Sequence, residues 1–169
     1  MFGGIIADKN ISLIRDEICK LANEQLNKPY VHGKHGPYSF DCAGLIWYLY
    51  HELFDIDLYE IGFGLSTSTM ILTSRYGKVT LYKDNTIYKD LFLNNGDILF
   101  FHRQSKNDNI PKEDNRYPGH CGIYIGNNNF IHCSRKYNMV TMNNLDKDTY
   151  WKKILVGSKD IVCKQKKIL

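Results

Sequence analysis

The sequence has no apolar run close to the roughly 20 residues that a membrane-spanning helix requires, so we expect no membrane insertion. It also lacks a basic leader, and the apolar stretch within residues 1–9 is too short for a secretory signal. We therefore expect the chain to be cytoplasmic as synthesised, with export only by a phage, holin or specialised secretion route. No linker, internal repeat or low-complexity segment divides the 169 residues, which predicts a single domain.

The five cysteines form no CxxC pair, so the sequence predicts no zinc site. The chain is also too long to depend on a disulfide framework. Four of the six histidines have no neighbours at metal-ligand spacing and are expected at the surface or in packing. These are His32, His35, His51 and His102. We therefore expect no metal.

The formal net charge of +4 is mildly basic, and part of it comes from the tail at 164–169, which we expect to be disordered. This charge supports nucleic-acid binding only weakly, and attraction to an anionic polymer such as a bacterial wall fits equally well. We expect a monomer that binds no nucleic acid.

Helical periodicity precedes strand-like periodicity along the chain. Apolar residues at helical spacing predict helices over 11–26, 42 to about 54, and 66–75. Short runs rich in β-branched and aromatic residues predict five strands, at 97–102, 121–125, 129–133, 139–142 and 151–156. Helices followed by strands are typical of an α+β domain with an antiparallel sheet of five to six strands.

Cys42 opens the second predicted helix, directly after Asp41. A helix N-terminus lowers the pKa of a thiol, and a nearby imidazolium lowers it further. Asp41 is placed to cap the helix, and the N–H groups of Cys42 and Ala43 are placed to bind an oxyanion. Taken alone, however, this segment favours a buried structural cysteine.

A predicted hairpin over 119–133 carries His120 on one strand and His132 on the other. The two imidazoles suit the roles of general base and orienting residue for a cysteine nucleophile. A two-residue turn would send the rings to opposite faces, whereas a three-residue loop or a bulge would restore a common face. In that second case, His132 is expected opposite Tyr124, about four residues from His120.

Five blocks in this order resemble the NlpC-type cysteine peptidases, papain-like bacterial enzymes that cut peptidoglycan stem peptides. The blocks are 29–33, 40–45, 96–101, 120–126 and 130–132. The resemblance covers about residues 10–157, and the separation of the two histidines is also similar to that of the family. It identifies the chain as one NlpC-type catalytic domain.

The resemblance implies that Cys42 is the nucleophile, His120 the base and His132 the orienting residue. It also implies that the Tyr30 hydroxyl assists the oxyanion hole and that Asp41 meets a substrate amine. Packing for Tyr30 and simple helix capping for Asp41 are the alternatives. The implied reaction is hydrolysis of the amide between γ-D-glutamate and diaminopimelate, or lysine, with no cofactor.

Three positions depart from the family pattern. Ala43 replaces the usual serine, His32 a usual aromatic residue, and Lys34 a usual glycine. These changes affect expected substrate contacts, including the one assigned to Ala43. They leave room for an amidase or acyltransferase acting on another γ-glutamyl, lipid or protein substrate. A non-catalytic module, for instance in a phage tail, is the other alternative. The polar loop at 103–119 is expected to narrow a groove or bind a partner.

Overall fold

The computed structural model describes residues 8–58, 71, 77–82, 92–102 and 118–162. The helix expected at 66–75, apart from Ile71, lies outside these residues. So do most of the loop at 103–119 and the tail at 164–169. Within the described ranges, no helix combines the length and apolar character needed to cross a membrane.

Among the described residues, two helices come first in the chain and the strands follow, with one short helix between the last two strands. In chain order they are α1 (Asp8–Glu24), α2 (Cys42–Phe54), β1 (Lys78–Leu81), β2 (Ile98–Phe101), β3 (His120–Gly126), β4 (Asn129–Ser134), β5 (Met139–Asn144), α4 (Thr149–Ile154) and β6 (Leu155–Asp160). All neighbouring strands pair antiparallel, in the order β1-β6-β2-β3-β4-β5. The predicted α+β class is confirmed.

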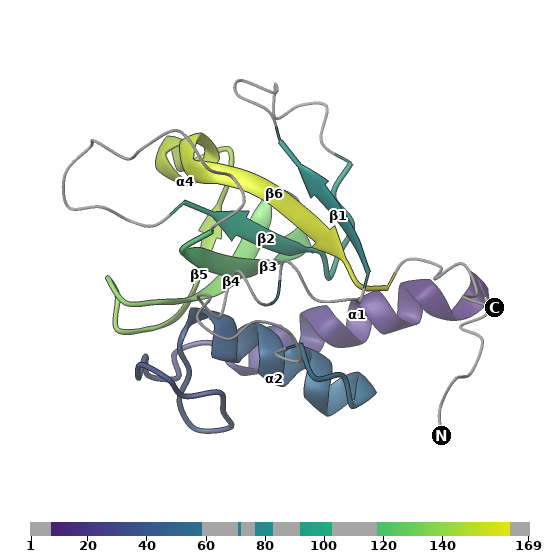
Figure 1. The fold of residues 1–169 in the computed structure, drawn as a ribbon, viewed down its shortest axis with the longest axis horizontal. Coiled ribbons are helices and arrows are strands. Elements are labelled where there is room, and N and C mark those ends of the chain that lie inside the picture. The colour runs from purple at the N-terminus through teal and green to yellow at the C-terminus, as the bar shows by residue number, and fades with distance from the viewer. Residues whose placement is uncertain (1–7, 59–70, 72–76, 83–91, 103–117, 163–169) are drawn as a thin grey trace.

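The sheet separates two apolar cores, with α1 and α2 against one face (Figure 1). Strand β2 lies inside the sheet and is buried on both sides. Its residues Ile98 and Phe100 pack into the core shared with the two long helices. Leu99 and Phe101 pack into the second core, which includes Trp151 of α4. Alternate side chains of a strand point to opposite faces, so one four-residue strand contributes to both cores.

Helix α2 begins at Cys42 because Asp41 is extended and caps it, its side chain accepting a hydrogen bond from the Gly44 N–H. At the other end Asp55 takes a left-handed conformation, with φ 55°, and its N–H bonds the carbonyl of His51. The helix packs on β3 and β4. Its capped N-terminus therefore has a fixed position on the sheet.

The strand predicted at 151–156 is wrong: this stretch is the end of α4 followed by the first residues of β6. Asp148 caps the helix by accepting the Tyr150 N–H, and Trp151 and Ile154 are both buried. These two residues are three apart in the sequence, a spacing that places both side chains on one face of a helix. A helix here covers the second core.

Strand β1 was not predicted, because it has only four residues and all of them are exposed. Its start is marked by Gly77, with φ 75°, where an added Cβ would lie 2.3 Å from the Asp160 carbonyl oxygen. The glycine allows β1 to reach the edge of β6.

Gly44 permits close contact between α2 and the loop that precedes it. An added Cβ would lie 2.1 Å from the carbonyl oxygen of Lys34, which itself accepts the Asp41 N–H at 2.7 Å. We expect Gly44→Ala to lower the free energy of unfolding by about 2 kcal/mol, because the loop must move. Helix propensity alone predicts that alanine raises the free energy of unfolding by about 1 kcal/mol. A decrease therefore identifies the contact with the Lys34 carbonyl as the cause.

Urea denaturation measures this change. Glu52→Ala, on the exposed part of the same helix, is the control and is expected within about 0.5 kcal/mol of the wild type. A Gly44→Ala protein as stable as the wild type would show that the contact is not needed.

Candidate active site

Asp41 is buried, and both of its carboxylate oxygens accept backbone hydrogen bonds. Oδ1 accepts the Gly44 N–H at 2.7 Å and Oδ2 accepts the Gly33 N–H at 2.9 Å. Burial raises the pKa of the carboxyl, and these two bonds oppose the rise. Asp41 therefore acts as the expected helix cap and also fixes the preceding loop. Its contact with a substrate amine stays a prediction.

Tyr30 lies beside the start of α2. Its N–H bonds the Asn138 carbonyl at 2.9 Å, and a β-bridge joins it to Phe40. Burial raises the pKa of its hydroxyl, and the nearby negative charges of Cys42 and Asp41 raise it further. Tyr30 thus remains a protonated donor near the partly exposed Cys42. The side chain of the third expected substrate residue, Ala43, is instead fully buried in the core.

Two buried thiols connect the start of α2 and the residue before its cap to the sheet. Cys121 of β3 donates to the Cys42 carbonyl at 3.4 Å, and Cys133 of β4 donates to the Phe40 carbonyl at 3.1 Å. Burial, followed by the charge of Cys42, raises the pKa of Cys133 to about 12. Both thiols are packing residues of the larger core, as predicted. Because Cys121 follows His120, the contact places Cys42 beside the start of β3.

The hairpin brings His120 and His132 into direct contact, with 2.8 Å between Nε2 of His120 and Nδ1 of His132. The turn has two residues in left-handed conformations, Asn127 and Asn128. A bulge before it shifts the register, so that Ile123 pairs with Ile131. The bulge is the alternative that places both rings on one face.

The expected position of His132 opposite Tyr124 is wrong. Continuing the observed register places His132 opposite Gly122, only two residues from His120. An added Cβ at Gly122 would lie 3.1 Å from the Cβ of His132 and 3.0 Å from the Phe130 ring. The glycine therefore leaves room for the side chains of His132 and Phe130.

The pair is enclosed: His120 is 8% exposed and His132 is 0% exposed. Trp151 packs beside both rings, with centroid distances of 5.5 and 4.7 Å. Burial lowers the pKa of His132 to about 3, and the neighbouring His120 contributes to the lowering. His132 is consequently a neutral imidazole at physiological pH.

Sequence reasoning missed Asn143 of β5, whose Oδ1 lies 2.9 Å from Nε2 of His132. The residue falls just beyond the strand expected at 139–142, and only the register between β4 and β5 reveals that it lies near the histidines. Trp151 was also missed, because residues 151–156 were expected to form a strand and Trp151 lies in helix α4.

Two of the remaining histidines serve in packing around Trp47. The ring of His51 stacks on the indole with centroids 4.3 Å apart, and the His35 ring lies 4.9 Å away on a tilted plane. Among the described residues, no three histidine, cysteine or acidic side chains form a group that would hold a metal ion.

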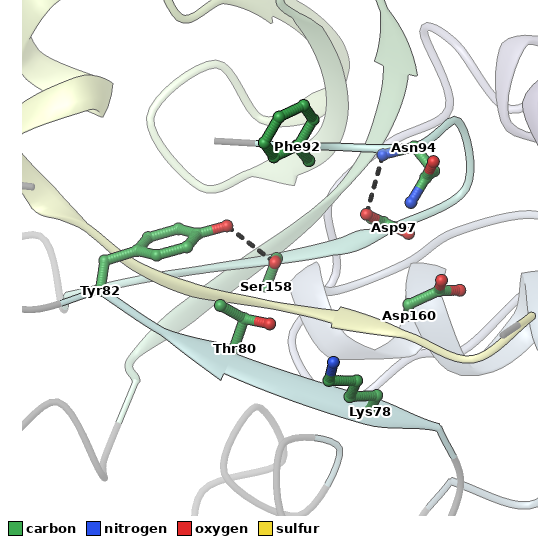
Figure 2. A pocket seen from close by; sticks show the side chains of 8 residues that line it. All are labelled: Lys78, Thr80, Tyr82, Phe92, Asn94, Asp97, Ser158 and Asp160. Carbon is green, nitrogen blue, oxygen red and sulfur yellow. Dashed lines mark hydrogen bonds between the residues drawn. The ribbon is translucent and has the colours of Figure 1, made fainter. Parts of the chain in front are cut away.

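A cavity of about 340 Å³ lies elsewhere, over β1, β6 and the turn before β2 (Figure 2). Its buried acid Asp97 and neighbour Asp160 are both paired with Arg15, at 3.2 and 2.8 Å. Burial raises the pKa of Asp97 to about 6. The lining described contains neither a thiol nor an imidazole. This cavity is therefore distinct from the Cys42 region, which is the candidate active site.

Parts of several known proteins are similar to this chain. It is 26% identical over 140 residues to the murein DD-endopeptidase MepH of Escherichia coli, covering 82% of this chain and 43% of that protein. It is 30% identical over 131 residues to the gamma-DL-glutamyl hydrolase of Bacillus subtilis, covering 77% and 24%. The chain thus spans less than half the length of these relatives.

The fold is also similar to that of NlpC2 from Trichomonas vaginalis, with a TM-score of 0.62 and 24% identity. That match covers 88% of this chain and 47% of the other. Both the expected family and the papain-like fold are confirmed. The sequence profile of the NlpC/P60 family matches residues 27–160, and the chain belongs to this family.

Proposed function

We propose that the protein is a cysteine endopeptidase that hydrolyses an amide bond in peptidoglycan stem peptides. The observation that carries the proposal is the His120–His132 contact, which supplies an oriented imidazole at the strand beside Cys42. The relatives of this protein include proteins named as a murein endopeptidase and a gamma-glutamyl hydrolase, which supports the proposed substrate class.

In the proposed reaction, His120 takes the proton of the Cys42 thiol, and Sγ attacks the carbonyl carbon of the substrate. N–H groups at the start of α2 stabilise the oxyanion, assisted by the Tyr30 hydroxyl. The C–N bond breaks as His120 returns the proton to the leaving amine. Water, deprotonated by His120, then cleaves the thioester and releases a carboxylic acid and the free thiol.

The proposed bond joins γ-D-glutamate to diaminopimelate or lysine. Support for the γ-glutamyl side comes from the gamma-DL-glutamyl hydrolase, which is 30% identical to this chain. The side chain of Ala43 is fully buried. The proposed substrate contacts are therefore those of Tyr30 and Asp41. The partner in this proposal is the stem peptide, and the reaction requires no cofactor.

Purified muropeptides with defined stems test the bond. We expect mass spectrometry to detect a fragment that ends in glutamate and a second that begins with diaminopimelate or lysine. Cleavage at another amide would assign a different bond. Intact muropeptides together with cleavage of another γ-glutamyl, lipid or protein substrate would favour the amidase or acyltransferase alternative. A protein that binds muropeptides and cleaves none of these substrates would favour a non-catalytic module.

A further inference from the structure

Asn143 connects the histidine pair to an acidic residue outside the expected triad. Its Oδ1 lies 2.9 Å from Nε2 of His132, and its Nδ2 points to Oδ2 of Asp148 at 3.5 Å. The other oxygen of Asp148 accepts the Tyr150 N–H at 3.1 Å and caps α4. A polar chain therefore runs from His120 through His132 and Asn143 to Asp148.

The donors and acceptors along this chain have one consistent direction. An ionised carboxylate accepts hydrogen bonds only, so Asp148 favours the NH2 end of the Asn143 amide, even at 3.5 Å. The amide oxygen then faces Nε2 of His132, and that nitrogen must carry a hydrogen.

Neutral His132 has one ring hydrogen. If this hydrogen is on Nε2, then Nδ1 is an acceptor, and Nε2 of His120 must donate to it across 2.8 Å. Nδ1 of His120 is then the nitrogen with the free electron pair in the neutral ring. This is the atom required to accept the proton of the thiol.

We propose that Asn143 and Asp148 are positioning residues that fix the tautomers of His132 and His120, leaving Nδ1 of His120 as the base. This role rests on the proposed function of Cys42 and His120. Asp148 acts from the cap of α4, the helix that also carries Trp151 against both rings. One carboxylate thus fixes the orientation of the amide and the start of the helix.

Asp148→Asn is the most informative substitution, because asparagine is also a good helix cap. To keep accepting the Tyr150 N–H, its Oδ1 must take the place of the Asp148 oxygen that caps α4. Its NH2 group then faces the NH2 group of Asn143. This repulsion favours rotation of the Asn143 amide, which would place a donor opposite Nε2 of His132 and move the ring hydrogen to Nδ1.

The experiment is NMR of the full chain labelled with 15N-histidine, where the nitrogen shifts distinguish the two tautomers. In the wild type we expect hydrogen on Nε2 of His132 and His120. In Asp148→Asn we expect hydrogen on Nδ1 of His132, with a fall of roughly 100-fold or more in kcat for the stem peptide, because the base is held in the wrong tautomer. Asp146→Asn, which removes an exposed carboxylate from the same loop, is the matched control and should change neither readout.

A second pair of variants covers misfolding of Asp148→Asn. Asn143→Ala removes the acceptor and should give mixed tautomers, whereas Asn143→Asp keeps an oxygen opposite Nε2 and should preserve the wild-type tautomer. A wild-type His132 with hydrogen on Nδ1, or tautomers unchanged in both Asp148→Asn and Asn143→Ala, would overturn the proposal. The NMR result does not depend on turnover, so failure to cleave stem peptides would refute the proposed function alone.

Discussion

Replacing His120 with alanine is expected to lower kcat/KM for the stem peptide at least about 10³-fold. The imidazole is proposed to take the thiol proton and return it to the leaving amine, so both chemical steps lose their proton carrier. The same variant should slow alkylation of Cys42 by iodoacetamide at neutral pH, because the thiol loses the base that takes its proton. Peptide mapping by mass spectrometry measures alkylation at each cysteine.

Cys19 provides an internal standard for that experiment. Burial and the nearby Asp16 raise the pKa of its thiol, so it should react slowly in every variant. His35→Ala is the matched substitution, because His35 is exposed and packs on Trp47 away from the catalytic pair. Retention of more than a tenth of wild-type kcat/KM in His120→Ala would exclude His120 as the base.

His132→Ala is expected to reduce kcat/KM roughly 10²-fold, because His120 loses the acceptor that orients its ring. His132→Asn supplies an amide oxygen and should recover part of that loss. Steady-state kinetics on the stem peptide separates the two variants. If the alanine and asparagine variants both had the kcat/KM of the wild type, His132 would have no orienting role.

The same residue makes folding sensitive to acid. Unfolded His132 binds a proton near pH 6.5, whereas the buried ring binds one only near pH 3. The folded protein therefore loses stability as the pH falls through this window. Comparing urea denaturation at pH 7 and pH 4.5, we expect His132→Asn to lose about 2 kcal/mol less than the wild type. His35→Asn, a substitution at the surface, should show the full wild-type loss.

The start of α2 was predictable because its signals are local. Asp41 and Cys42 are adjacent to the apolar stretch that forms the helix, and the cap uses an N–H only three residues away. The strands β2 to β5 were likewise found from short apolar runs. In each case the residues that determine the element lie within it.

Contacts between distant elements were not predictable. The bulge before Asn127 decides which residue lies opposite His132, and its presence was only one of the alternatives compatible with the alternation of the strands. Asn143 and Trp151 reach the histidines from β5 and α4, which come later in the chain. Their roles depend on strand register and helix packing, and neither is encoded in a short motif.

Digestion of whole peptidoglycan by the wild type and by Cys42→Ala, in parallel, tests the central claim most directly. Mass spectrometry would count the new amino groups and identify the fragments released. We predict release by the wild type and none by Cys42→Ala, with Cys19→Ala as active as the wild type. Equal release by the wild type and Cys42→Ala would contradict a thiolate mechanism at Cys42, and no release by either would contradict the peptidoglycan substrate.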